Sequence, residues 1–273
     1  MSNKEIRIVD EKKGIIQITC SDERWYAFPG EDKSTGLPKY TFLPSVTWIC
    51  SVYPKGIGFY KYLASMNWDD SQAIMKAAGN KGSKVHNACC VVERDGKLSI
   101  DATFQNNDTG FQESLTTEEL ECIYSFTKWH NDTNPQLLAS EMTVLGSFYA
   151  GSLDRIYRIN GVIYIVDLKT SSSIWEDYKL QISAYSHANI DYKALSITDI
   201  EWSQRKLAIL QVGYKLNKNG YKFTEIEDKF ELFLIAHKLW LNENADAKPK
   251  QKDFPLILTI KKETKNEIHQ DNK

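Results

Sequence analysis

The sequence has few cysteines, and their spacing is not that of a metal cluster. Five cysteines occur in 273 residues, with no CxxC pair among them. They are Cys20, Cys50, Cys89, Cys90 and Cys122. An odd number of thiols without paired spacing argues against a disulfide framework and against a four-thiolate zinc or iron–sulfur site. We therefore expect a protein of a reducing cytoplasm, whose thiols mostly fill the core.

Long apolar runs and an excess of charge of one sign are also absent. No stretch approaches the roughly 18 apolar residues that span a bilayer, and residues 1–5 lack the apolar start of a secretion signal. We therefore expect no membrane partner. The 34 basic and 36 acidic side chains give a net charge of −2, so any basic surface for a nucleic acid must be local. GxGxxG, phosphate-loop and GxSxG motifs, which mark other α/β enzymes, are missing as well.

What the sequence does contain is the pattern of one α/β core with additions at both ends. The first half predicts a hairpin over 6–18, a loop over 29–40, a helix beginning near Ser45, short helices over 58–66 and 71–78, a helix over 82–92, and a helix from the capping box at Thr116 to Trp129. We expect an N-terminal elaboration at 1–42, a core at 43–244 and a peripheral tail at 245–273.

The second half predicts three consecutive strands, over 138–146, 150–159 and 162–168. Asn160-Gly161 joins the last two, and this dipeptide is a strong hairpin signal. A helix over 174–188, a strand over 206–214 paired with 221–226, and a helix over 230–241 complete the pattern. Lysines 55, 61, 76, 81 and 84 precede His86 and form either a local positive track or an ordinary solvated surface.

One acid–x–Lys triplet stands out among eleven in the chain. Only the triplet that begins at Asp167 follows five consecutive apolar residues, 162–166, which indicates a buried central strand. The alternation of a strand places Asp167 and Lys169 on the same face. Two charges at the end of a buried strand are costly unless they meet partners or a metal.

The Asn160-Gly161 turn supplies a candidate partner for Asp167. Pairing the two strands about this turn sets Asp154 opposite Asp167. Two neighbouring carboxylates repel each other unless a cation lies between them. Carboxylates, water and phosphate oxygens are the ligands that Mg²⁺ prefers, so the pattern predicts a divalent-metal site.

These motifs together resemble the PD-(D/E)XK nuclease superfamily, in its RecB-like and phage- and mitochondrial-type exonuclease branch. The pieces are Gly151-x-x-Asp154, Asp167-x-Lys169-Thr170, Gln181-x-x-x-Tyr185, Gly82-Ser83-x-x-His86 and the upstream acid Glu141, within residues 43–214. The resemblance implies a restriction-endonuclease-like core: helix, three-stranded antiparallel meander, helix and strand, with a mixed central sheet flanked by helices. The four-cysteine iron–sulfur cluster and the fused helicase found in parts of that branch have no counterpart here.

The resemblance also implies roles for individual residues. Asp154, Asp167 and the Leu168 carbonyl would hold Mg²⁺ or Mn²⁺, and His86 and Glu141 would complete the metal shell. Lys169 would orient or deprotonate the attacking water and stabilise charge on the scissile phosphate. Gln181 would orient Lys169 or bind a phosphate, and the expected contacts to DNA are Tyr185, Lys84 and Ser83.

The expected function is a metal-dependent DNA exonuclease of phage-type replication or recombination, in a bacterial or phage-infected cell. Its expected partners are DNA and a single-strand-annealing or helicase protein. Two alternatives remain open: a structure-specific or restriction-type endonuclease, and an inactive DNA-binding member of the fold. Simpler interpretations of the residues are a satisfied helix histidine (His86), a solvent-facing acid (Glu141), a surface ion pair (Asp154 with Arg155), a strand-end lysine (Lys169) and a core aromatic (Tyr185).

Overall fold

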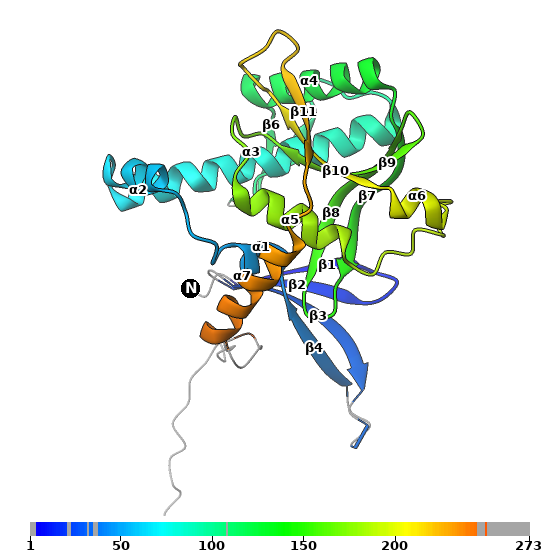
Figure 1. The fold of residues 1–273 in the computed structure, drawn as a ribbon. Coiled ribbons are helices and arrows are strands. Elements are labelled where there is room, and N and C mark those ends of the chain that lie inside the picture. The colour runs from blue at the N-terminus through cyan, green and yellow to red at the C-terminus, as the bar shows by residue number, and fades with distance from the viewer. Residues whose placement is uncertain are drawn as a thin grey trace, which may run out of the picture.

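The computed structural model describes residues 4–20, 23–31, 33–34, 38–107, 109–244 and 249. Over these residues the protein is a mixed α/β structure (Figure 1). A five-stranded sheet lies between two layers of helices, and a four-stranded N-terminal sheet packs beside it. No helix in the described part of the chain is long and apolar enough to cross a membrane. The tail predicted beyond 245 lies outside the described residues, except for position 249.

The N-terminal sheet contains β1 (Lys4–Asp10), β2 (Ile15–Cys20), β3 (Glu23–Glu31) and β4 (Pro38–Pro44), all antiparallel. The first two strands confirm the hairpin predicted over 6–18. The loop predicted over 29–40 is wrong at both ends, because Pro29 and Gly30 pair with Tyr40 and Lys39. The β2–β3 ladder ends at Ala27, so no neighbour on that side requires the N–H that Pro29 lacks.

The five-stranded sheet has the order β11-β10-β9-β8-β7. Its members are β7 (Gln136–Leu145), β8 (Ala150–Ile159), β9 (Val162–Lys169), β10 (Lys206–Val212) and β11 (Tyr221–Ile226). All neighbours are antiparallel except β9 and β10, which are parallel. Asn160 and Gly161 have φ values of 49° and 81°, as the tight turn predicted between β8 and β9 requires.

Helices cover both faces of this sheet. The helices of the described residues are α1 (Val46–Cys50), α2 (Ile57–Ala64), α3 (Trp68–Asp95), α4 (Thr117–Thr133), α5 (Glu176–Ser186), α6 (Asp199–Ser203) and α7 (Phe230–Glu243). Helices α3 and α4 pack on one face, and α1, α5 and α7 on the other. The predicted caps are confirmed: Ser45 accepts from the Trp48 amide, and Thr116 forms a capping box with Glu119.

Helix α3 corrects the prediction of two short helices over 71–78 and 82–92. It is one helix of 28 residues, because two internal glycines cost only about 1 kcal/mol each. Burial of its Val85–Cys89 turn against the sheet offsets that cost. Strands β5 (Thr103–Gln105) and β6 (Gln112–Ser114) and helix α6 were not predicted from the sequence.

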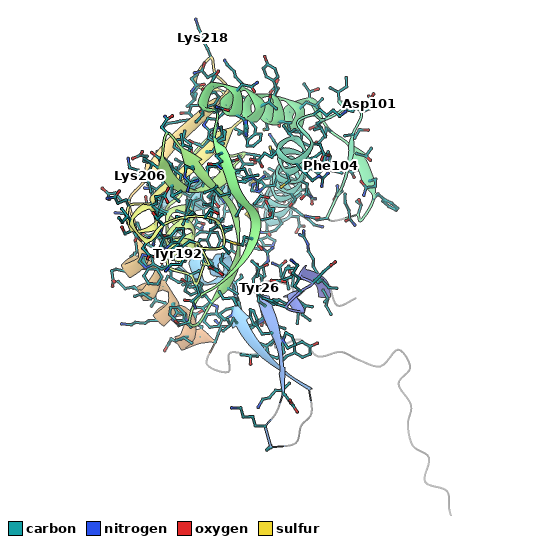
Figure 2. The ribbon with its side chains drawn as sticks, turned by 90° about the vertical axis from the view of Figure 1, so that its right-hand side faces the viewer. Tyr26, Asp101, Phe104, Tyr192, Lys206 and Lys218 are labelled. Carbon is teal, nitrogen blue, oxygen red and sulfur yellow. The ribbon has the colours of Figure 1, made fainter. Side chains whose placement is uncertain are left out.

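The N-terminal sheet shares its core with the main body of the protein. Trp25 of β3 packs edge-to-face against Trp48 of α1 and Trp240 of α7, with ring centroids 5.0 and 5.9 Å away. Tyr26, on the opposite face of β3, lies where the two sheets meet (Figure 2). The division of the chain at residue 42 stays a prediction, but the packing fixes this sheet beside the edge of β7 and β8.

Candidate metal centre

Three possible metal ligands converge at the edge of the sheet, from three different elements. His86 lies on α3, Glu141 on β7 and Asp154 on β8, and one donor atom of each lies within 4.8 Å of the other two. The His86 Nδ1 atom is 3.6 Å from Asp154 Oδ2 and 3.8 Å from Glu141 Oε1. Imidazole nitrogen and carboxylate oxygen are the donors that Mn²⁺ and related divalent ions accept, so this set fits a cation.

The orientation of His86 suits a ligand. Its Nε2 atom lies 2.8 Å from the Leu168 carbonyl oxygen, which only accepts hydrogen bonds, so Nε2 carries the proton. In a neutral ring the Nδ1 atom then has no proton, and its lone pair faces the carboxylates of Glu141 and Asp154. Histidines that bind metals commonly donate their other N–H to a carbonyl in this way. Burial opposes the charged ring, but Asp154 and Glu141 outweigh it and raise the pKa of His86.

The ligation of a metal by Leu168 stays a prediction, and the structure gives its backbone two further contacts. Its carbonyl oxygen, which is expected to ligate the metal, accepts a hydrogen bond from His86 Nε2–H and so fixes the orientation of the imidazole ring. Its amide donates to Asp154 Oδ2 at 2.8 Å. The β8–β9 ladder stops at the Arg155–Val166 pair, and the Asp154 side chain takes the place of the next backbone partner. This hydrogen bond fixes the direction of the carboxylate.

Glu141 is held by its backbone and by a buried arginine. Its φ of 47° is left-handed, a strained conformation for a glutamate that costs roughly 1–2 kcal/mol. The Arg155 Nη1 atom donates to Glu141 Oε1 at 2.9 Å. Burial acts against the charged carboxylate, but His86 and Arg155 outweigh it, and the pKa of Glu141 falls to about 2. Glu141 is therefore an anion at neutral pH.

Arg155 overturns the interpretation of residues 154 and 155 as a surface ion pair. Arg155 is 1% exposed, and its Nε donates at 2.6 Å to Glu93, whose side chain is 2% exposed. Tyr157 donates to the same carboxylate. The guanidinium also donates to the carbonyl of Asp154, and not to its carboxylate. Strand β8 is covered on both faces, so its side chains are buried. A buried guanidinium group is costly without counter-charges, which explains why Arg155 lies beside the two acids Glu93 and Glu141.

Asp167 is not a member of the three-ligand group. It is 1% exposed, and its Oδ2 lies 2.7 Å from the Lys169 Nζ atom, but neither carboxylate oxygen accepts a well-formed hydrogen bond. Burial raises the pKa of Asp167 to about 6, against the opposing charge of Lys169 and with a further rise from Asp154. The predicted register is kept, since β8 and β9 pair about the 160–161 turn. A buried carboxylate that has an ion pair but no well-formed hydrogen bond, close to Asp154 and His86, fits a cation bound nearby.

Lys169 extends from the end of β9 into the cavity. Its ammonium group lies 4.5 Å from the centre of the Tyr178 ring, and its side chain is 17% exposed. Burial opposes the charge, but Asp167 and Asp154 raise the pKa of Lys169. Lys169 is therefore a cation held between Asp167 and Tyr178, rather than a strand-end lysine that reaches freely into water.

Gln181 and Tyr185 face the same cavity from α5. The Gln181 amide donates to the Tyr185 hydroxyl at 2.9 Å. Tyr185 is 3% exposed and packs in the core, as the simpler interpretation holds, so we assign it a supporting role in place of the predicted contact with DNA. Its ring explains Gly151: a Cβ atom at that position would lie 2.5 Å from Tyr185 Cε1.

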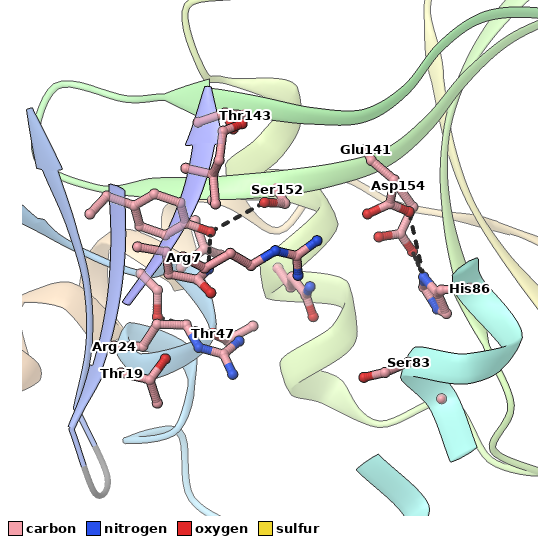
Figure 3. A pocket seen from close by; sticks show the side chains of 18 of the residues that line it. Arg7, Thr19, Arg24, Thr47, Ser83, His86, Glu141, Thr143, Ser152 and Asp154 are labelled. Atoms are coloured by element: carbon pink, nitrogen blue, oxygen red, sulfur yellow. Dashed lines mark hydrogen bonds and ion pairs between the residues drawn. The ribbon is translucent and has the colours of Figure 1, made fainter. Parts of the chain in front are cut away.

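One polar cavity of about 480 Å³ is lined by six of these residues (Figure 3): His86, Glu141, Asp154, Lys169, Gln181 and Tyr185. Ser83 also lines it and accepts a hydrogen bond from Asn107. Lys84 does not. It is 5% exposed and forms ion pairs with Glu119 at 2.9 Å and Glu113 at 3.4 Å, so we remove it from the predicted contacts with DNA.

The predicted lysine track is also largely neutralised. Lys55 pairs with Asp177 at 2.6 Å, and Lys81 pairs with Glu118 at 2.9 Å. With Lys84, three of its five members have acidic partners, which favours the ordinary surface over a track for DNA.

Sequence reasoning missed the opposite wall of the cavity. Arg7 of β1, Gln17 of β2 and Arg24 of β3 line it. The side chains of Arg7 and Arg24 extend from this wall into the cavity (Figure 3). The alternation along these three paired strands is visible in the sequence, but the position of this sheet beside β8 is not. Arg155 and Glu93 were missed for the same reason.

The chain was also compared with known proteins. No protein-family model matches it, and a search of curated proteins found no significantly similar sequence.

Proposed function

We propose that this protein is a divalent-metal-dependent deoxyribonuclease with a restriction-endonuclease-like core, and that it degrades DNA from its ends. The observation that carries the proposal is the convergence of His86, Glu141 and Asp154 beside the Asp167–Lys169 pair, at the edge of a mixed sheet and inside a polar cavity. The order of helix α3, meander β7–β9, helix α5 and strand β10 agrees with that type of core.

His86, Glu141 and Asp154 would hold a Mg²⁺ or Mn²⁺ ion, which would supply Lewis-acid activation of water and of the scissile phosphate. Two carboxylates and one neutral imidazole carry a charge of −2, which a divalent cation balances. Asp167 would remain close enough to adjust this charge. Because nitrogen is one of the donors, we expect tighter binding of Mn²⁺ than of Mg²⁺.

Lys169 would act on the reacting phosphate. Its ammonium group is held by Asp167 on one side and by the Tyr178 ring on another, with its exposed part in the cavity. A fixed cation in a partly dry site stabilises the negative charge that develops on a phosphate oxygen as water attacks. Gln181, fixed by Tyr185, lies on the same wall and would bind a neighbouring phosphate oxygen.

Digestion of three labelled DNAs tests this function. The substrates are a linear fragment, a closed circle and a single-stranded oligonucleotide, each incubated with Mg²⁺, Mn²⁺ or EDTA. We expect loss of the linear and single-stranded DNA with either metal, an intact circle, and no digestion in EDTA. Cutting of the circle would replace the exonuclease with the endonuclease alternative. No digestion of any substrate with either metal would leave the inactive DNA-binding alternative.

A further inference from the structure

The six arginines of the chain divide into two groups. Four of them donate to acceptors within the protein: Arg94, Arg155, Arg158 and Arg205. Among the described residues Arg7 and Arg24 have no ion-pair or hydrogen-bond partner for their guanidinium groups, and both face the cavity (Figure 3). Two unpaired guanidinium groups in a polar cavity of a near-neutral protein indicate a ligand that carries negative charge.

The strand registers place both arginines on one face of the N-terminal sheet. Arg7 pairs with Gln17, and Gln17 pairs with Tyr26, while Arg24 pairs with Thr19 one step along the same face. The opposite face, with Trp25 and Ala27, is buried in the core. The polar face therefore has one orientation, toward the metal centre.

Two contacts fasten this face to the strands that carry the metal ligands. The Tyr26 hydroxyl lies 3.3 Å from Ser152 Oγ, and Thr143 Oγ1 donates to the Val9 carbonyl at 3.1 Å. Ser152 and Thr143 each lie two positions along their strand from a candidate metal ligand. Ser152 precedes Asp154, and Thr143 follows Glu141. Arg24 and Arg7 likewise lie two positions from Tyr26 and Val9, about 7 Å along each strand.

We propose that the N-terminal sheet is the second wall of a groove for single-stranded DNA, in which Arg7 and Arg24 bind the backbone phosphates next to the one at the metal centre. The identity of the ligand as DNA rests on the proposed nuclease function. Arginine forms paired hydrogen bonds with phosphate oxygens, and such contacts fix the position of a strand without reading its sequence.

The single-stranded form of the ligand is part of the proposal. It follows from the close approach of the two walls, which the Tyr26–Ser152 and Thr143–Val9 contacts join around the cavity. The comparison of a single strand with a blunt duplex tests this part directly.

Binding without cleavage tests the inference. The probe is a fluorescein-labelled single-stranded 15-mer in EDTA, measured by anisotropy at several salt concentrations. We expect Arg7→Ala and Arg24→Ala each to weaken binding about tenfold, and to lower the slope of log K against log salt by about 0.7 per residue. Arg7→Lys and Arg24→Lys keep the charge and should recover most of the affinity. Lys33→Ala is the matched control, because it removes one charge from the turn after β3, outside the cavity.

The binding and digestion experiments distinguish failure of the proposed groove from failure of the proposed nuclease function. If the single strand binds through both arginines but no metal supports digestion, the groove stands and the nuclease proposal fails. If digestion occurs while the double variant Arg7→Ala/Arg24→Ala keeps wild-type affinity, salt slope and KM, the groove is wrong. Absence of binding by the wild type, equal loss in Lys33→Ala, or a blunt duplex bound as tightly as the single strand would also overturn it. Circular dichroism confirms that each variant is folded.

Discussion

Two polar clusters are adjacent in the structure, one on the α3 face of the sheet and one lining the cavity, and they differ in how completely their groups are paired. In the buried cluster, Arg155, Glu93 and Tyr157 satisfy one another. In the cavity cluster, His86 Nδ1 faces two carboxylates, and Asp167 accepts no well-formed hydrogen bond. The two clusters meet at Glu141, because Arg155 of the buried cluster donates a hydrogen bond to this carboxylate of the cavity cluster.

This difference separates a structural role from a functional one. A buried charge with complete partners maintains the fold, and its removal leaves another buried charge unpaired. A cluster with unsatisfied acceptors beside a cavity is arranged for something that enters from solvent. We therefore expect substitutions in the cavity cluster to change chemistry and substitutions in the buried cluster to change stability.

Asp154→Asn is expected to have the largest effect on activity. The amide oxygen still accepts from the Leu168 N–H, but the ligand charge is lost, so digestion should fall at least 1,000-fold, about 4 kcal/mol in the barrier. The measurement is the initial rate on labelled linear DNA in Mn²⁺. The control is Asp101→Asn, the same change at an exposed site outside the cavity. Digestion by Asp154→Asn within tenfold of the wild type would remove Asp154 from the metal centre.

Arg155→Met is expected to have the largest effect on stability. It leaves Glu93 buried without its cation, which should lower the free energy of unfolding by about 3–5 kcal/mol. Urea unfolding in EDTA measures this loss. The double variant Arg155→Met/Glu93→Gln should recover part of it, because the unpaired charge is then absent. If Asp154→Asn proves as destabilising as Arg155→Met, the contrast between the two clusters fails.

Lys169→Met should slow digestion about 100-fold while leaving the affinity for Mn²⁺ within a fewfold of the wild type. The reason is that the ammonium group is assigned to the phosphate and not to the metal. Single-turnover rates and calorimetric titration with Mn²⁺ separate the two effects. Lost metal binding with an unchanged rate at saturating metal would contradict this assignment.

Gly151→Ala should lower the free energy of unfolding by about 1–3 kcal/mol, because its Cβ would lie 2.5 Å from the Tyr185 ring. Gly58→Ala is the control: its Cβ would meet open space in helix α2, so it should be neutral or stabilising by up to about 1 kcal/mol. Tyr185→Leu in the Gly151→Ala background should restore part of the loss. Equal effects of the two glycine substitutions would show that Tyr185 does not set the requirement at 151.

Local signals explain what the sequence predicted. The apolar run before Asp167, the Asn160-Gly161 turn and the capping box at Thr116 each depend on neighbouring residues, and the structure has the hairpin and the helix that they predict. The register placed Asp154 and Asp167 near each other, but it did not predict that Asp154 would replace a backbone partner of Leu168 while Asp167 paired with Lys169.

Contacts between distant segments account for what was missed. The burial of Arg155 depends on helices that cover both faces of β8. The orientation of Arg7 depends on how the N-terminal sheet docks on β7 and β8, through contacts that join residues more than 120 positions apart. No local pattern carries that information.

Diffraction from crystals soaked in Mn²⁺ tests the central claim most directly. At the manganese absorption edge we predict an anomalous peak between His86 Nδ1, Glu141 and Asp154, and loss of that peak in Asp154→Asn crystals. A saturating soak that leaves no peak at this position, or that places Mn²⁺ only on exposed carboxylates elsewhere, would contradict the account.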